Sequence, residues 1–363
     1  MFSADLGVQA AGAPPFAGTQ FLAVGHQNSP FVTVYPWSSS TGFGTKFINP
    51  SPLPNTSPSS AARGVAFTPS GNALAVFGGG ELGKNVIPYG VSVYAWTVTG
   101  FGSKFADPPS RPNGPCLGGA FSTQGNAIIL LGSASSTFDN AYALGWSGSG
   151  FGARLTTFAN IPSTGLGCSF SPTGNAVAIA HSSGDRISAF AWTGSTFGTQ
   201  FAAPSVLPAG VNSYGCAFSP SGNALAVAHE NTPFISVYPW TVTGFGTKVA
   251  DPTTRPTGIG NGCSFSPSGD ALAVAHNNTP YITVYPWTGS SFGTKFADPT
   301  TPVANIANSC AFSPDGQALA IAHYGTPYIS AYRWTSTGFG TQFVNPTILP
   351  PSSAFSCAFG VIP

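Results

Sequence analysis

The chain has 363 residues, of which only 6% are charged, and its formal net charge is +1 at pH 7. An ordinary soluble domain carries roughly 25% charged residues. With so few charges and almost no net charge, this chain lacks the excess of basic residues that a nucleic-acid-binding surface needs. No apolar run approaches the ~18 residues that a membrane span needs, and the N-terminus lacks a basic segment followed by an apolar one. We therefore expect no nucleic acid partner, no membrane insertion and no secretory signal.

One tryptophan-bearing unit recurs from end to end. It is clearest from Cys263 to Asp298, CSFSPSGDALAVAHNNTPYITVYPWTGSSFGTKFAD. Successive tryptophans are 59, 50, 46, 48, 47 and 47 residues apart. Self-similarity at such a period indicates a repeat architecture and overrides the two or three domains that length alone would suggest. The tryptophans, one per unit, are Trp37, Trp96, Trp146, Trp192, Trp240, Trp287 and Trp334.

Each unit contains four short extended segments, separated by turn signals. In chain order they read, for example, CAFSP, ALAVAH, FISVYPW and GFGTK, within residues 216–248. None has helical spacing, and the two middle segments are apolar or small on both faces, which predicts burial on both sides. The sequence therefore predicts an all-β fold, a seven-bladed β-propeller with four antiparallel strands per blade.

The two ends of the chain predict how the ring closes. Residues 357–360, CAFG, repeat the start of a unit, whereas the first unit begins near its second strand, FLAVGH at 21–26. We predict that 357–363 supply the inner strand of the first blade, giving an N-terminal arm at 1–20 and a propeller at 21–363. Alternatively, residues 15–18 form a shortened inner strand and the C-terminus is free.

The second and third segments, read together as LAVAHxNTP[FY]I[ST]VYxW, resemble the LASGSxDxTIxIW pattern of the WD-repeat superfamily. The resemblance covers about residues 21–363 and implies a propeller that serves as a binding platform. Two positions depart from that pattern. No Asp follows the Trp, and the His lies at the end of the second strand rather than before the first.

The cysteines and histidines are mostly repeat positions. Packed sheets lie roughly 10 Å apart, beyond the ~7 Å that a disulfide spans, so we expect buried free thiols, with a metal site in the channel as the alternative. The histidines all end a second strand, and we expect each to bond the following turn rather than to form a ring of metal or glycan ligands. Neither a metal nor another cofactor is predicted. The five equivalent cysteines are Cys168, Cys216, Cys263, Cys310 and Cys357, and the histidines are His26, His181, His229, His276 and His323.

Candidate catalytic residues are harder to find. The sequence has no phosphate-binding loop, Cys-x-x-Cys pair, His-Glu-x-x-His helix or nucleophile elbow. Asp107, Asp251 and Asp298 recur in an Ala-Asp-Pro motif, where we expect them to cap turns. With no distinguished nucleophile and base, we predict that the protein is not an enzyme and has no catalytic residues.

The places where the repeat breaks are the candidates for recognition. The first three units carry longer connections, at about 51–63, 78–90 and 132–140, which a propeller places in one sector of one face. The alternative is drift in loops that tolerate insertion. The candidate binding residues in this sector are Glu81, Lys84, Tyr89, Phe138 and Asp139.

The sequence thus favours a non-enzymatic structural or binding module. A surface low in charge and rich in Thr, Ser, Gly and Asn, with no secretory signal, suits a phage virion component made in the host cytoplasm. We expect a tail, fibre or capsid decoration protein that contacts neighbouring protein subunits or host surface glycans. The alternatives are an adhesin or lectin at the cell surface and a propeller enzyme that acts on polysaccharide.

Overall fold

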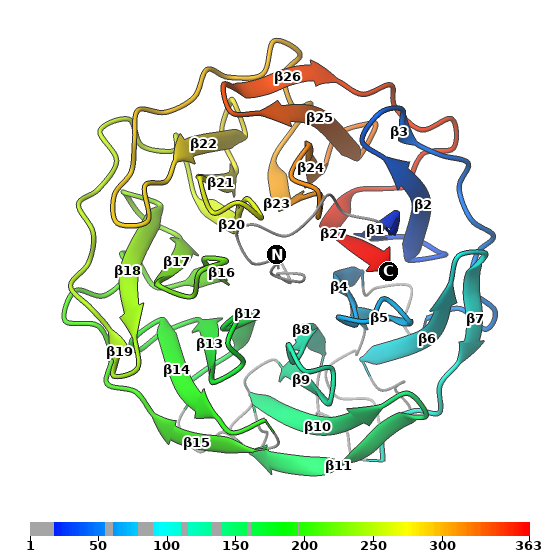
Figure 1. The fold of residues 1–363 in the computed structure, drawn as a ribbon, viewed down its shortest axis with the longest axis horizontal. Helices are drawn as coiled ribbons and strands as arrows, with labels where there is room; N and C mark the ends of the chain where they lie inside the picture. Colours follow the sequence, from blue (N-terminus) through cyan, green and yellow to red (C-terminus); the bar gives the residue numbers. More distant parts are fainter. Residues whose placement is uncertain are drawn as a thin grey trace.

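A computed structural model shows seven antiparallel sheets arranged as blades around a central axis (Figure 1). The predicted all-β, seven-bladed propeller is confirmed. Among the described residues no segment is helical, so none forms a helix that could cross a membrane. The structure describes residues 18–54, 61–78, 90–109, 115–132, 140–157, 161–194 and 196–363.

The strands of each blade run in order from the axis to the circumference. Blade 1 has β27 (Ala354–Ile362), β1 (Thr19–His26), β2 (Val32–Ser38) and β3 (Gly42–Phe43). Blades 2 and 3 have β4 (Ala62–Phe67), β5 (Ala73–Gly78), β6 (Val91–Thr97) and β7 (Gly100–Lys104), then β8 (Cys116–Phe121), β9 (Ala127–Gly132), β10 (Ala141–Ser147) and β11 (Gly150–Thr157). Blades 4 and 5 have β12 (Gly165–Phe170), β13 (Ala176–His181), β14 (Ile187–Trp192) and β15 (Phe197–Gln200), then β16 (Ser213–Phe218), β17 (Ala224–His229), β18 (Ile235–Thr241) and β19 (Gly244–Phe245). Blades 6 and 7 have β20 (Gly260–Phe265), β21 (Ala271–His276) and β22 (Ile282–Pro286), then β23 (Ala307–Phe312), β24 (Ala318–His323), β25 (Ile329–Thr335) and β26 (Gly338–Gln342).

The second strands are buried on both faces because they alternate small and large side chains. Ala178 and Ala180 of β13 share one apolar cluster with Leu225 and Val227 of β17 in the next blade. Small residues of one sheet thus face large residues of its neighbour, which lets the two sheets interdigitate at the density of a protein interior.

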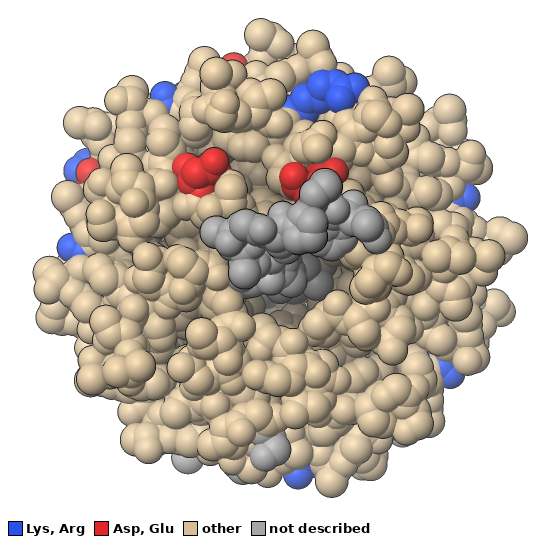
Figure 2. Space-filling view, viewed as in Figure 1, with Lys and Arg blue, Asp and Glu red and all other residues tan. Residues whose placement is uncertain are grey.

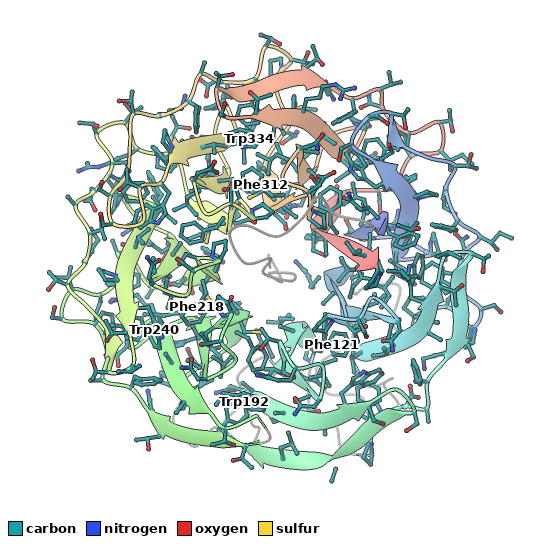
Figure 3. All side chains as sticks on the ribbon, viewed as in Figure 1. Phe121, Trp192, Phe218, Trp240, Phe312 and Trp334 are labelled. Carbon is teal, nitrogen blue, oxygen red and sulfur yellow. The ribbon has the colours of Figure 1, made fainter. Side chains whose placement is uncertain are left out.

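Each tryptophan lies inside a group of phenylalanine rings. Trp240 contacts Phe218 of the inner strand, Phe245 of the outer strand and Phe201 of the preceding blade, with ring centroids 5.1 to 5.2 Å apart and planes nearly perpendicular. Figure 3 shows the same order in other blades, with Phe312 nearer the axis than Trp334. Edge-to-face contacts of this kind add roughly 0.5–1.5 kcal/mol each to the burial of the rings, so the tryptophan ties together three strands and two blades.

The C-terminal strand closes the ring, as predicted. β27 pairs antiparallel with β1 from Thr19 opposite Ile362 to His26 opposite Ala354. The strand therefore begins at Ala354, three residues before the predicted start at 357. A free C-terminus with residues 15–18 as the inner strand is wrong, because β27 occupies the inner position.

The outer strands are short, and blade 6 keeps only a bridge from Trp287 to Phe292 in place of its fourth strand. The Ala-Asp-Pro carboxylates lie just beyond these strands. Asp107 pairs with Lys104 at 2.5 Å, and the same pairing joins Asp251 with Lys248. Figure 2 shows how sparse charge is elsewhere on one face of the ring, with isolated basic residues near the circumference.

Candidate functional site

Every inner strand contains a β-bulge at the same place. In blade 5, Ser213 pairs with His229 and Gly215 pairs with Ala228, so Tyr214 between them has no partner in β17. Bulges redirect a side chain and are common beside functional sites. The seven bulged residues, which we call the axial ring, are Arg63, Leu117, Leu166, Tyr214, Asn261, Asn308 and Phe355.

The axial ring surrounds the propeller axis on one face. Its members lie where the chain enters each inner strand, opposite the end of the second strand. The inner strands β27, β4, β8, β12, β16, β20 and β23 all border the centre of the molecule (Figure 1). The ring is therefore on the face that carries the connections between blades and the loops from second to third strands.

The members of the axial ring differ in chemistry, unlike the rest of the repeat. Blades 6 and 7 contribute Asn261 and Asn308, whose Nδ2 atoms donate to the carbonyls of Ala307 and Ala354 in the next blade at 2.8 and 2.7 Å. Blades 3 and 4 contribute half-buried leucines. Asn261, Asn308 and Phe355 are buried, so the side chains of this column that stay partly exposed are those of blades 2 to 5. They are Arg63, Leu117, Leu166 and Tyr214, an asymmetric set of the kind that binding one small molecule in one orientation requires.

A cation lies in blade 2. The Arg63 guanidinium lies over the Phe355 ring at 4.5 Å from its centroid, and Tyr324 of blade 7 meets the same ring edge-on at 5.6 Å. Burial raises the pKa of the Tyr324 phenol, and the positive charge of Arg63 opposes that rise. The row Tyr324, Phe355, Arg63 therefore spans three blades and holds the guanidinium in place.

A carboxylate lies beside the ring in blade 5. Glu230 Oε2 accepts hydrogen bonds from the backbone nitrogens of Val211 and Asn212, at 2.9 and 3.3 Å, and from Asn212 Nδ2. Burial, followed by the Glu230 charge, raises the pKa of Tyr214. Blade 5 therefore presents a phenol that stays protonated near neutral pH close to a fixed carboxylate.

The five histidines form a second, buried set. Each Nε2 is hydrogen-bonded to a Ser or Thr hydroxyl seven residues later, for example His229 to Ser236 at 2.9 Å and His276 to Thr283 at 2.9 Å. The expected bond to the following turn is clearest in His181, whose Nδ1 lies 3.2 Å from the Ser182 carbonyl oxygen. In the other four, backbone hydrogen bonds with turn residues partly offset the effect of burial on the imidazole pKa. The Ser–His spacing is that of a nucleophile and its base, but all five imidazoles are fully buried, so no substrate reaches them.

Burial also fixes the protonation of this set. It lowers the pKa of His26, His229, His276 and His323 to about 4 and lowers that of His181. The imidazoles are therefore neutral in the folded protein at neutral pH.

The six cysteines are free and buried. Burial raises the pKa of Cys116 and Cys357 to about 12. These thiols therefore stay protonated near neutral pH, whereas nucleophilic attack and metal binding need the thiolate. Across the described ranges no group of three potential metal ligands comes together.

The predicted contact sector, at 51–63, 78–90 and 132–140, lies mostly outside the described residues. Its named residues Glu81, Lys84, Tyr89, Phe138 and Asp139 all lie outside the described residues. Arg63 ends the predicted stretch 51–63 but was not among the candidates. The signal that could have found the ring is the column two residues before the repeated cysteine, which holds Arg, Leu, Leu, Tyr, Asn, Asn and Phe in successive blades.

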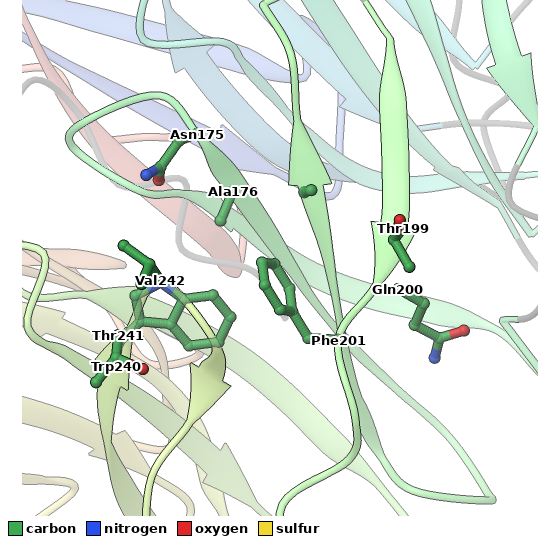
Figure 4. A pocket seen from close by; sticks show the side chains of 9 residues that line it. Asn175, Ala176, Thr199, Gln200, Phe201, Trp240, Thr241 and Val242 are labelled. Carbon is green, nitrogen blue, oxygen red and sulfur yellow. The ribbon is translucent and has the colours of Figure 1, made fainter.

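A groove of about 390 Å³ lies between blades 4 and 5 on the opposite face. Figure 4 shows Phe201 and Trp240 beside Gln200 and Asn175 along its walls. No charged side chain lines this groove, so it lacks an acid or base, and we place the functional site at the axial ring instead.

No family model matches the chain, and no curated protein matches it in sequence. In structure it is similar to a candidate 6-phosphogluconolactonase from Bacteroides uniformis, with a TM-score of 0.70 and 16% identity over 94% of this chain and 99% of that one. A second candidate 6-phosphogluconolactonase, from Bacteroides fragilis, has a TM-score of 0.70 and 13% identity over 94% and 98%. The periplasmic gluconolactonase of Pseudomonas aeruginosa has a TM-score of 0.68 and 14% identity over 95% and 100%.

These likenesses establish the fold, and they contradict the expectation of a non-enzymatic virion component. Three of the propellers that match 94–95% of the chain are named as lactonases or candidate lactonases, and none of these three is named as a scaffold, tail or capsid protein. The expectation rested on the lack of a local catalytic motif. In a propeller, however, residues that meet at the axis come from different blades, so a site needs no local motif. The virion location was inferred from that role and loses its support with it.

Proposed function

We propose that the protein hydrolyses small sugar-derived lactones at the axial ring. The observation that carries the proposal is that, in blade 5, the charge of the fixed Glu230 carboxylate acts on the half-buried Tyr214 phenol, in a ring that also holds the Arg63 cation. The whole-chain likeness to propellers named as lactonases supports the choice of substrate.

Lactone hydrolysis needs a base for water and a donor for the oxygen that leaves. The hydrogen bonds that hold Glu230 all go to Oε2, so among the described residues Oε1 is available to take a proton from water. The resulting hydroxide adds to the lactone carbonyl carbon, and the ring C–O bond then breaks. Tyr214 donates its proton to the ring oxygen as it leaves, and the product is the open-chain hydroxy acid.

We also propose that the blades are distant relatives of the WD-repeat superfamily. The bond from His323 to Ser330 and the tryptophan at the end of each third strand support this kinship. The low charge of the chain agrees with a small-molecule substrate rather than a polyanion.

The test is proton release from δ-gluconolactone, measured in a pH-stat against spontaneous hydrolysis. We expect the wild-type chain to accelerate the reaction and Glu230→Gln to lose at least about 100-fold, the loss typical of a general base. Gln keeps the carbonyl oxygen that accepts the bonds from Val211 and Asn212, so the loop retains its shape.

The matched control is Asp185→Asn, which removes an exposed carboxylate from the corresponding loop of blade 4. We expect that variant to hydrolyse the lactone at the wild-type rate. A wild-type chain that fails to exceed the spontaneous rate with both δ-gluconolactone and its 6-phosphate contradicts the proposed function.

A further inference from the structure

Three arginines among the described residues lie over aromatic rings, and one of them has no hydrogen-bonded partner. Arg333 stacks on Phe343 at 4.5 Å, but its Nη1 and Nη2 donate to the carbonyls of Ser39 and Ser40 at 2.9 and 2.7 Å. Arg63 stacks on Phe355 at the same 4.5 Å, and within the described ranges no carboxylate or carbonyl accepts from its guanidinium. The scaffold therefore uses the donors of Arg333, whereas no described residue accepts a hydrogen bond from Arg63.

Arg63 is half-buried, and its guanidinium is positioned by stacking. Phe355 is 6% exposed and its ring also makes an edge-type contact with Tyr324, so the surface that Arg63 stacks on is fixed. A planar guanidinium fixed by stacking presents two parallel N–H donors, which match the two oxygens of a carboxylate or phosphate. Partial burial of a cation costs hydration free energy, and an anionic group of a ligand can offset that cost.

We infer that Arg63, stacked on Phe355, is the receptor for an oxyanion group of the ligand, a phosphate or a carboxylate. The inference rests on the proposed function only for the kind of ligand, a sugar acid or its lactone. Blade 2 lies nearly opposite blade 5 in a ring of seven, so the anionic end of the ligand binds at Arg63 and the reacting end faces Tyr214 and Glu230.

Isothermal titration at low ionic strength tests this with three probes: 6-phosphogluconate, gluconate and inorganic phosphate. If Arg63 binds the phosphate group, we expect 6-phosphogluconate to have the highest affinity of the three probes. If Arg63 binds the carboxylate, we expect gluconate and 6-phosphogluconate to have equal affinities. Arg63→Gln weakens the preferred probe by at least about tenfold, the effect of losing one charged hydrogen bond. Arg63→Lys, which keeps the charge but not the planar pair of donors, gives an intermediate loss.

Arg333→Gln is the matched control, because it removes a guanidinium that also stacks on a phenylalanine ring at 4.5 Å but belongs to β25 of blade 7, outside the axial ring. We expect its affinity for all three probes to equal that of the wild type. Wild-type affinity in Arg63→Gln, or an equal loss in Arg333→Gln, overturns the inference. The probes are not hydrolysed, so binding is measured independently of activity. If the chain binds 6-phosphogluconate through Arg63 but does not hydrolyse lactones, the proposed function is contradicted and the inference about Arg63 is not.

Discussion

Gln20 Nε2 donates a hydrogen bond to Asp315 Oδ2 at 3.0 Å, across 295 residues of sequence. The same carboxylate accepts from Ser39 Oγ at 2.5 Å and, through Oδ1, from Ser313 Oγ at 2.6 Å. Gln20 and Ser39 belong to blade 1, whereas Asp315 lies in the first hairpin of blade 7. The ring is therefore closed by a side-chain latch as well as by β27.

Replacing the latch carboxylate should weaken the closure. Burial would raise the pKa of Asp315, but hydrogen bonds from Ser313, Ser39 and Gln20 outweigh it and lower the pKa. The latch thus stabilises the fold above about pH 4 and is lost as the pH falls through the lowered pKa. We expect Asp315→Ser, which installs the residue of blades 2, 5 and 6, to cost about 1–2 kcal/mol in urea unfolding at pH 7. An unchanged midpoint would mean that β27 alone closes the ring.

The buried histidines predict steep acid unfolding. Their pKa values of about 4, against about 6.5 in the unfolded chain, mean that the unfolded state binds more protons between these values. The stability is fully present above pH 6.5 and is lost as the pH falls towards 4. Four such groups give a slope of about 5 kcal/mol per pH unit near pH 5. Urea midpoints measured from pH 7.5 to 5 check this, and midpoints that do not change over that range contradict it.

The aromatic groups predict unequal costs for the same substitution in two blades. Trp240 contacts three phenylalanines, whereas Trp287 contacts Phe265 and Phe292 only, with Val249 in the place of the third ring. We expect Trp240→Leu to destabilise the protein by about 1 kcal/mol more than Trp287→Leu does, because it removes one further edge-to-face contact. Equal thermal midpoints would show that the ring from the preceding blade contributes nothing.

Much of the fold could be predicted because the repeat is regular. The spacing of Trp37 and its equivalents gave the number of blades, and the stray CAFG at 357–360 gave the closure. The partner of each histidine could also have been found, since a Ser or Thr follows every His by seven residues, as in His181 and Ser188.

The axial ring could not be predicted in the same way. Asn261 and Tyr214 occupy one column of the repeat, but nothing in their sequence context shows that this column falls on a bulge of each inner strand. The sequence pattern of a strand predicts that successive side chains alternate between the two faces of the sheet, and a bulge interrupts that alternation. The variety of the column was visible in the sequence. The position of that column on a bulge follows only from the pairing register of the inner and second strands.

The repeated positions hold the fold, and under the proposed function the varied axial column carries the activity. The most direct test is Tyr214→Leu, which gives blade 5 the residue that blade 4 has at Leu166, measured at once for thermal midpoint and for δ-gluconolactone hydrolysis. We expect a midpoint within about 2 °C of the wild type, as for a half-buried surface substitution, and hydrolysis reduced to the spontaneous rate. A variant that hydrolyses the lactone as fast as the wild type would contradict it.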